Sequence, residues 1–511
     1  MAFRALRGLA ISIALSSTSP VAGSEDADIQ QQIAQMTELV KAGDSKVENL
    51  QYVHRGLARK LRDTSGPRVS YLMKGVNEVL GGALVVFLGS GAAMSKAGGG
   101  RGSLTTSASG AGASLVGFYL FGYAFGFGGH FNPDGSKETN FIGYTGFAGT
   151  NTVRRLSDEM VEPTTDPGRF FYYWACSALL SCIVSSSLGI RIGFVGDMIY
   201  TFFLSAWIWP CIVGATWGGG FLATMSDIGY VDQLGSGIIF LTGGVSALVG
   251  CIIAGRRNRR FPDDWDAKKR MAELPEEYWP GSLPLFTTGT FFMWFGWYGL
   301  GVGSIRPDLS PAAAGFMAAH IAMNMTISAA VSGLVVFVLR YAMLRRYDIT
   351  GLCNGILAGL VSISAGCGNI DTGSALLTGF LGALFYQGAS ILVKVAKIDD
   401  QSDAFAIYGA CGIWGCLAAA FFDWGAGMGH GHGRYGFACV AGHNNCSMDS
   451  ENFGGQLFVA NLALIAFIIL WAGFFSALLF IILKMVKLLG PPEDPPAPVV
   501  EEYPEEPLAS I

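Results

Sequence analysis

Charge is what this 511-residue sequence has least of: only 14% of its residues are Asp, Glu, Lys or Arg, whereas 51% are hydrophobic. A water-soluble domain needs more polar surface than this composition supplies. Hydrophobic stretches of about 20 residues recur along the chain, and each is long enough to cross about 30 Å of hydrocarbon as a helix. A helix satisfies its own backbone hydrogen bonds, as lipid requires. The composition therefore predicts an all-α integral membrane protein.

A large excess of either charge is also missing, because 33 basic and 38 acidic residues leave a net charge of -5. Lys and Arg cluster only in short loops, which gives no support to nucleic-acid binding. The ten cysteines show no metal-ligand spacing, and eight of them fall in hydrophobic stretches between residues 176 and 416, where a thiol behaves as a small apolar group. Cys439 and Cys446 lie in a polar loop and could form a disulfide if that loop is extracellular. We expect no metal, no cofactor and no enzyme activity.

The N-terminal pattern is that of a targeting segment. Residues 1–24 carry Arg4 and Arg7, then a short apolar run and the small residues Val21, Ala22 and Gly23. This order predicts a cleavable signal peptide, which would place the next segment outside the membrane. The alternative is an uncleaved disordered tail.

A polar, helix-favouring segment covers residues 25–68. Apolar residues recur in it at spacings of three and four, with Gly43 and His54 filling two of the positions. A trimeric coiled coil and a helix lying on the membrane domain both fit this pattern, and the break at Gly43 favours the second. We assign residues 69–486 to the membrane domain and the acidic, proline-rich residues 487–511 to a disordered cytoplasmic tail.

Eleven membrane spans are predicted within the membrane domain. They cover approximately residues 70–93, 105–127, 168–190, 194–216, 234–255, 282–302, 311–341, 351–369, 372–395, 404–423 and 456–485. With the N-terminus outside, the basic loops 96–101, 256–260, 345–346 and 394–397 all lie inside, as the positive-inside rule requires. The same count places the C-terminus inside and residues 424–455 outside.

A weak internal repeat relates the two halves of the domain. The fifth span follows Asp232 and the tenth follows Asp403, and each acidic residue precedes a helix punctuated by glycine. Two halves of five spans have opposite topology, which predicts an inverted five-plus-five repeat plus one final helix. Glycines at such positions are equally compatible with close helix packing.

Several short motifs occur in a specific order between residues 70 and 485. They are FYLFGYAF from Phe118, TWGGG from Thr216, DQLGSG from Asp232, WFGWYG from Trp294, CNG from Cys353, AGCG from Ala365, and KIDD from Lys397 with GIWG from Gly412. Together they resemble the ammonium transporter (Amt/Mep/Rh) family. The resemblance implies an Amt-type channel in a homotrimer, each subunit with its own pore for ammonium or ammonia, surrounded by membrane lipid.

The resemblance also assigns an outer substrate-binding site. Trp217 and Ser304 stand where the family's cation-binding Trp and Ser stand, although an interfacial Trp and a helix-packing Ser fit the same positions. Cation–π contact with an indole offsets part of the hydration that a cation loses in a membrane. Asp232 matches the family's acidic residue near this site, where it orients neighbouring groups more than it contacts the ion.

The pore-lining positions depart from the family pattern. Cys176 and Leu300 replace the two phenylalanines that block the family's pore entrance, which predicts a wider entrance. Phe240, eight residues after Asp232, and Tyr408, five after Asp403, replace the twin pore histidines.

Two larger rings at the centre are expected to narrow or seal the pore. Phe240 has no hydrogen-bonding atom, and a tyrosine hydroxyl titrates near pH 10 in water, so the paired-imidazole route for a proton is lost. His320, the only histidine well inside a predicted span, is either a relocated titratable group or an ordinary histidine bonded to a nearby carbonyl.

We therefore predict an ammonium transmembrane transporter or channel, in the plasma membrane, with an altered pore. The alternatives are a non-conducting ammonium sensor or structural relative of the family, or a channel for another small neutral solute.

Overall fold

The computed structural model describes residues 47–99, 104–129, 141–150, 154–155, 161–162, 167–225, 229–257, 260–261, 281–305, 311–423 and 453–490. The predicted signal peptide, residues 25–46, the Cys439–Cys446 loop and residues 491–511 lie outside these ranges. The chain divides into two units, of which the larger comprises residues 74–306 and 312–511 and is called the membrane unit below. The other comprises residues 1–73 and 307–311.

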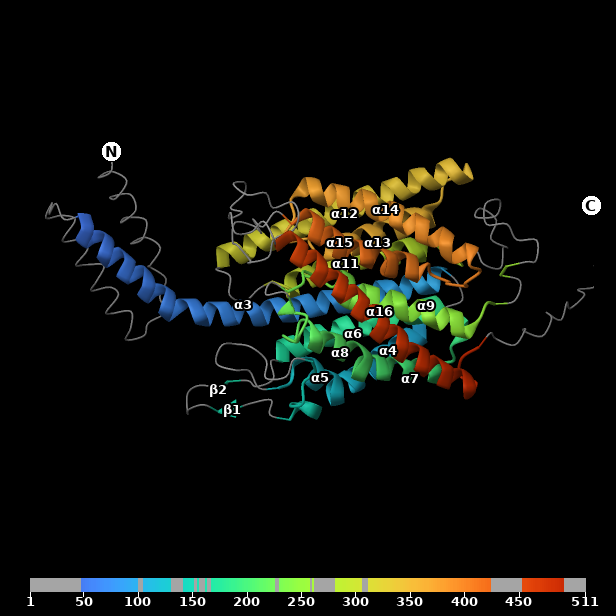
Figure 1. Ribbon diagram of the computed structural model, residues 1–511, viewed down its shortest axis with the longest axis horizontal. Coiled ribbons are helices and arrows are strands. Elements are labelled where there is room, and N and C mark those ends of the chain that lie inside the picture. Colours follow the sequence, from blue (N-terminus) through green and yellow to red (C-terminus); the bar gives the residue numbers. More distant parts are fainter. Residues whose placement is uncertain are drawn as a thin grey trace, which may run out of the picture. The chain divides into compact units, whose positions relative to one another are not determined.

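Helices dominate the described residues (Figure 1). Their bounds are α3 Val47–Gly99, α4 Leu104–Gly117, α5 Tyr123–Phe127, α6 Pro167–Leu188, α7 Phe194–Phe203, α8 Trp209–Ala215, α9 Thr242–Ala254, α11 Leu283–Gly303, α12 Pro311–Leu344, α13 Ile349–Ser364, α14 Thr372–Val395, α15 Cys411–Phe422 and α16 Phe453–Met485. Short turns of other helical type join some of them: η1 Phe118–Gly122, η2 Phe147–Gly149, η3 Gly189–Arg191, η4 Leu204–Ile208, η6 Ser236–Leu241 and η8 Phe405–Ala410. Two antiparallel strands, β1 Arg154–Arg155 and β2 Val161–Glu162, pair outside the helices.

The helical membrane fold predicted from composition is confirmed. Nine helical stretches among the described residues are long and apolar enough to cross a membrane. The sixth and eighth predicted spans correspond to α11, which has 21 residues, and to the shorter apolar helix α13. Each of the eleven predicted spans thus has a helix, and the chain is an integral membrane protein.

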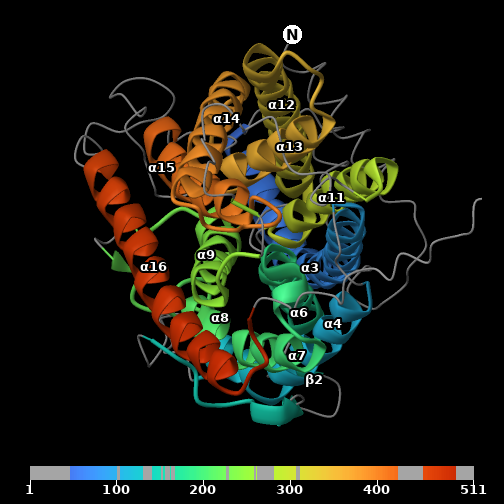
Figure 2. The same ribbon diagram turned by 90° about the vertical axis from the view of Figure 1, so that its right-hand side faces the viewer.

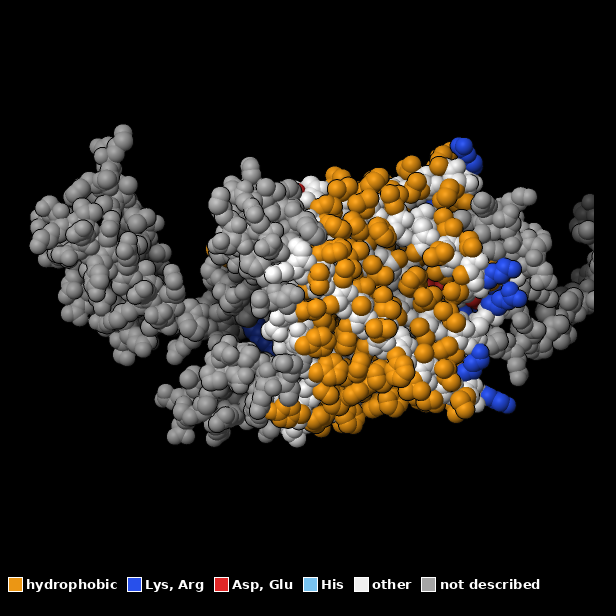
Figure 3. All heavy atoms as spheres, viewed as in Figure 1, with side chains coloured by type: hydrophobic (Ala, Val, Ile, Leu, Met, Phe, Trp, Pro, Cys, Tyr) orange, Lys and Arg blue, Asp and Glu red, His pale blue; other side chains and the backbone are white. Residues whose placement is uncertain are grey.

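The surface of the membrane unit carries an apolar belt (Figure 3). Large apolar side chains such as Phe291, Leu334, Val338, Leu470 and Phe474 are more than half exposed on it. Water does not tolerate such a surface, whereas hydrocarbon does. Lys and Arg side chains gather along one edge of this belt (Figure 3).

Two helices lie deep inside the bundle. Figure 2 looks along the helices and shows α6 and α9 near its middle, with α4, α7, α12, α14 and α16 around them. In the most apolar window of Ser236–Ala254, 78% of residues are buried inside the protein, against 28% for Gly455–Met485. The segments that carry Phe240 and Tyr408 meet at this core, where a Cβ on Gly244 would approach the backbone nitrogen of Gly409 to 2.2 Å. Only glycine allows backbones to pass this closely.

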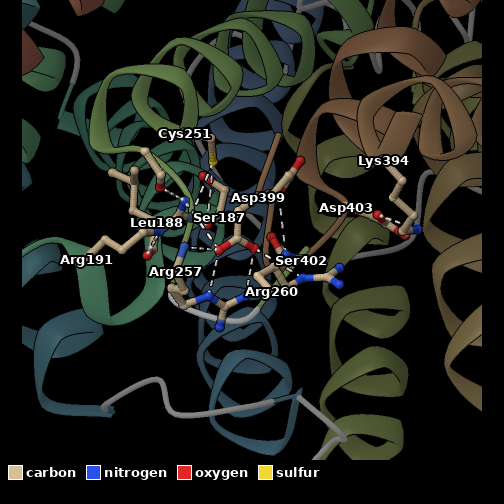
Figure 4. Close-up of polar contacts among 12 residues, drawn as sticks. Ser187, Leu188, Arg191, Cys251, Arg257, Arg260, Lys394, Asp399, Ser402 and Asp403 are labelled. Atoms are coloured by element: carbon tan, nitrogen blue, oxygen red, sulfur yellow. Dashed lines mark hydrogen bonds and ion pairs between the residues drawn. The ribbon is translucent and has the colours of Figure 1, made fainter. Parts of the chain in front are cut away.

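A buried carboxylate ties three segments together on the side where α6 and α14 end (Figure 4). Asp399 accepts hydrogen bonds from the Nε and Nη2 atoms of Arg257, both at 2.8 Å, and its carboxylate also pairs with Arg191 at 3.8 Å and Arg260 at 3.4 Å. Although burial alone would raise the pKa of Asp399, the hydrogen bonds from Arg257 and the charge of Arg191 lower it to about 2. The carboxylate is therefore ionised at neutral pH.

Residues 488–490, which follow α16, pack beside this cluster. The Gly193 amide donates to the Leu488 carbonyl at 3.1 Å, and the Gly490 amide donates to the Arg191 carbonyl at 2.9 Å. Leu489 between them is 4% exposed. Residues 487–490, which the sequence assigns to a disordered tail, are thus ordered, because this apolar side chain is buried and the adjacent backbone groups are bonded.

Asp399→Asn removes the charge that faces the buried Arg191, and breaking a buried ion pair costs about 3–5 kcal/mol. We expect the melting temperature of the purified protein at pH 7 to fall on the order of 10 °C. Because the carboxylate's pKa is depressed on folding, its contribution is present above about pH 4 and is lost as pH falls toward 2. The gap between native chain and variant should therefore begin to shrink below about pH 4.

The control for this experiment is Lys487→Gln, which changes an exposed charge and should leave the melting temperature nearly unchanged. Equal melting temperatures for native protein and Asp399→Asn at pH 7 would contradict the assigned role.

Candidate functional site

The two central pore positions lie on matching irregular turns. Phe240 lies on η6 and Tyr408 on η8, and both segments are π-helical and six residues long. The backbone nitrogen of Phe240 donates to the Gly235 carbonyl five residues earlier, at 2.9 Å. Such wide turns are uncommon inside helices and often mark functional sites. The internal repeat seen in the sequence thus extends to local geometry.

A buried carboxylate holds the start of each turn. Asp232 accepts hydrogen bonds from the backbone nitrogens of Gly235 at 3.0 Å, Gly237 at 2.9 Å and Ile238 at 2.8 Å. These amides at the helix start have no helical partner of their own. Burial raises the pKa of Asp232 to about 6 against the effect of these hydrogen bonds. Asp232 therefore has the contacts of a residue that positions η6.

In the second half this role belongs to Asp400, which corrects the pairing of Asp232 with Asp403. Asp400 accepts a hydrogen bond from the Phe405 nitrogen at 2.8 Å, and it precedes Tyr408 by eight residues, as Asp232 precedes Phe240. Burial and the neighbouring charge of Asp403 raise the pKa of Asp400 to about 6.

Asp403 forms ion pairs instead, with Lys394 at 3.1 Å and Arg340 at 3.6 Å. Although burial alone would raise the pKa of Asp403, these two charges lower it to about 2.

Three aromatic rings fill the centre of the membrane unit. Phe240 stacks on Trp297, with ring centroids 4.6 Å apart and planes 17° from parallel. Tyr408 stacks on the Phe240 ring, with ring centroids 5.9 Å apart and planes 19° from parallel. Phe240 and Trp297 are 0% exposed and Tyr408 is 5% exposed. The three rings are therefore packed against one another with almost no exposed surface.

The outer pair of predicted site residues lies on two different elements. Trp217 follows α8, is partly buried, and donates its indole N–H to the backbone carbonyl of Asp232 at 3.0 Å. Its ring lies 5.6 Å from that of Tyr173. Ser304 ends α11 and donates its hydroxyl to the Gly301 carbonyl at 3.0 Å. Hydrogen bonding thus joins Trp217 to the Asp232 corner, while the hydroxyl proton of Ser304 is used within its own helix.

Cys176 lies on α6 and Leu300 on α11, and both side chains are 0% exposed. Tyr172, one helical turn before Cys176, donates its hydroxyl to the Leu300 carbonyl at 3.0 Å and joins α6 to α11.

A cavity of about 570 Å³ lies on the other side of the ring stack. Tyr408 lines its inner end, and charged side chains of both signs line its wall. These are Lys96, Arg260, Arg340, Arg346, Lys394, Asp348, Asp400 and Asp403. Arg340 joins two of them, since it donates to Asp348 at 2.8 Å and forms an ion pair with Asp403 at 3.6 Å. The stack is therefore open to water-sized space on the Tyr408 side.

Sequence reasoning missed two residues of this site. Trp297 belongs to a motif that the sequence shows, but nothing in its spacing indicates that its ring covers Phe240. The eight-residue spacing common to both halves could have identified Asp400. Among the described residues no group of three His, Cys, Asp or Glu side chains could hold a metal ion.

Comparison with known proteins finds one matching family and several similar sequences. The model of the Ammonium Transporter Family matches residues 78–494. Ammonium transporter 1 member 1 of Arabidopsis thaliana is 30% identical over 396 residues, which are 73% of this chain and 71% of that protein. Ammonium transporter 1 member 1 of Solanum lycopersicum is 29% identical over 393 residues, with 73% of each chain covered.

Solved structures share the fold at lower identity. The structure titled Sensor Amt Protein has a TM-score of 0.68 and 23% identity, covering 83% of this chain and 95% of its own. Mep2 of Saccharomyces cerevisiae has a TM-score of 0.68 and 20% identity, covering 84% and 90%.

Asp232→Ala leaves up to three buried amides without an acceptor, and each unpaired group costs about 1–3 kcal/mol. We expect a large drop in melting temperature of the purified protein. Ser304→Ala is the matched control, because its hydroxyl bonds only within its own helix and its loss should cost about 1 kcal/mol or less. If both variants melt together, Asp232 does not hold η6.

Proposed function

The chain belongs to the Ammonium Transporter Family, and from this premise we propose that it carries ammonium nitrogen across a membrane as neutral ammonia, past a mobile aromatic barrier. The observation that carries the proposal is the arrangement of a Trp217–Asp232 corner on one side of the ring stack and an open cavity on the other.

The outer corner is suited to receiving a cation. The indole face of Trp217 and the neighbouring ring of Tyr173 offer cation–π contact. The indole N–H is already bonded to the Asp232 carbonyl, so the ring orientation is set before an ion arrives. Ser304, through its oxygen lone pairs, is the proposed hydrogen-bond acceptor for ammonium at the same site.

The ring stack determines which species passes. Phe240 offers no hydrogen bond to a charged species, and carrying a bare cation across the membrane centre is costly. Ammonium therefore returns its proton to water at the outer site, and neutral ammonia crosses after the rings rotate aside. The proton stays on the outer side, so the crossing moves no net charge.

The cavity beyond Tyr408 completes the path. Ammonia that passes the stack enters about 570 Å³ lined with charged side chains, where water can protonate it again. We place this cavity on the cytoplasmic side and the chain in the plasma membrane as a homotrimer within membrane lipid. The Lys and Arg side chains at one edge of the apolar belt support this orientation (Figure 3).

A non-conducting ammonium sensor is the second candidate, and the complete burial of Phe240 and Trp297 favours it. A protein that binds ammonium at Trp217 without opening the stack would report ammonium and transport none. The two functions differ in a single property, which is whether the rings move.

Uptake in a cell that lacks its own ammonium transporters separates them. We expect the native chain to support measurable methylammonium uptake, and Phe240→His with Tyr408→His to raise it several-fold, because imidazoles restore hydrogen bonds along the path. In proteoliposomes the native chain should carry no current with ammonium. Uptake only by the double variant would establish the sensor reading, and a saturable current through the native chain would overturn neutral passage.

Trp217→Leu tests the outer site. Loss of a cation–π contact worth about 0.5–2 kcal/mol should raise the half-saturating methylammonium concentration roughly 2- to 30-fold and leave the maximal rate nearly unchanged. Trp207→Leu is the control, because the Trp207 ring contacts Phe125 and Trp471. An unchanged half-saturating concentration in Trp217→Leu would remove this residue from the site.

A further inference from the structure

A buried carboxylate outside the proposed pathway has only one of its oxygens bonded. Asp197 lies in the first turn of α7 and is 1% exposed. Its Oδ1 atom accepts a hydrogen bond from the Ser185 hydroxyl on α6. Its Oδ2 atom has no hydrogen-bond partner among the described residues. Buried carboxylate oxygens are ordinarily bonded, so the unbonded one indicates a missing partner.

Two further buried hydroxyl oxygens, one on α7 and one on α4, are in the same state. Thr201 is four residues after Asp197 on α7, on the same face of the helix, and is 0% exposed. Ser107 on α4 is 7% exposed. Within the described part of the chain neither hydroxyl oxygen has a hydrogen-bond partner. Asp197 and Thr201 on α7 therefore form a candidate ligand pair, and Ser107 lies on α4, which packs against α7.

Gly110 leaves the space that such a ligand needs. A Cβ built on Gly110 would lie 3.6 Å from Asp197 Oδ2 and 3.7 Å from Thr201 Oγ1, and would meet nothing else within 4 Å. Ser107 is three residues before Gly110 and therefore on the same face of α4. The position that a side chain would take at Gly110 therefore faces two oxygen atoms of α7.

The charge balance favours a cation in this space. Asp197 forms no ion pair with any other described residue. Lys96 interacts with it electrostatically and lines the inner cavity, so the site lies near a route to water. A buried charge without a contacting counter-ion is costly.

We propose that Asp197, Thr201 and Ser107 bind one small monovalent cation in the space beside Gly110. One carboxylate and two neutral hydroxyls supply a single negative charge, whereas divalent ions prefer more carboxylates. Sodium and ammonium share the required chemistry, since each is satisfied by oxygen atoms. The cation links α4 to α7 directly and α6 through Ser185. This site is separate from Trp217 and the ring stack, so it does not depend on the proposed transport function.

Thermal unfolding of the full-length protein in detergent tests the site. Melting temperature is measured in choline chloride and in increasing NaCl, KCl or NH4Cl at constant ionic strength. The native protein should gain several degrees with a saturable dependence on Na⁺ or on ammonium, because a ligand that binds only the folded state stabilises it. Asp197→Asn should abolish this gain. Gly110→Ala, which fills the space and keeps the carboxylate, should shift the half-saturating concentration upward at least several-fold.

The matched control is Ser114→Ala. Ser114 is also buried on α4, but its hydroxyl is bonded to Ser177 and Ser205, so this variant should melt earlier and keep the full cation dependence. Binding of radioactive Na⁺ to the native protein, with ammonium as competitor, identifies the ion. The proposal is overturned if no cation changes the melting temperature of the native protein. It is also overturned if Gly110→Ala and, where it folds, Asp197→Asn respond to cations as the native chain does.

Discussion

Every polar backbone group that the membrane core buries must find a partner inside the protein, and the two central helix starts meet this constraint with one carboxylate each. Asp232 satisfies the amides that open η6, and Asp400 satisfies the Phe405 amide that opens η8. Because each turn is held eight residues before its ring, Phe240 and Tyr408 are brought to the same depth from opposite halves of the chain. The position of the ring stack therefore depends on the hydrogen bonds that satisfy these backbone amides. Glycines such as Gly244 and Gly409 let the two segments approach closely enough for the stack to form.

Much of this arrangement could be predicted from the sequence, because hydrophobic length, loop charge and motif order are local properties. The helices and the register of Phe240 and Tyr408 follow from such signals. The sequence left two roles open for His320, which contacts the Ile370 carbonyl at 2.8 Å. Contacts between distant segments could not be predicted in the same way. Nothing in the sequence places Trp297 over Phe240 or joins Leu489 to the α6–α7 corner, since both depend on how helices pack.

The exchange of roles between Asp400 and Asp403 shows where pattern reasoning fails. Both residues precede a helix, and a sequence shows only that an acidic residue lies near a helix start. The partner decides the role: Asp403 lies within reach of Lys394 and Arg340 and becomes an ion-pair residue. Asp400, three residues earlier, is left to bond the helix amides. Counting back eight residues from Phe240 or Tyr408 identifies the aspartate that bonds the helix amides. Counting from the helix start does not.

The adjacent residues Asp399 and Asp400 also limit how the stack can open. Asp399 is paired with three arginines from the α6 and α9 ends, while Asp400 holds the turn that carries Tyr408. A movement of η8 as a whole would pull on this loop and separate Asp399 from the buried Arg191. Breaking a buried ion pair costs about 3–5 kcal/mol. Rotation of a ring about its own side-chain bonds breaks none of these contacts. Tyr408 lines the cavity and has free space on that side, whereas Phe240 is enclosed. For the passage proposed above, the lowest-cost opening therefore begins with the Tyr408 ring turning toward the cavity, and the Phe240 ring follows into the volume that Tyr408 leaves.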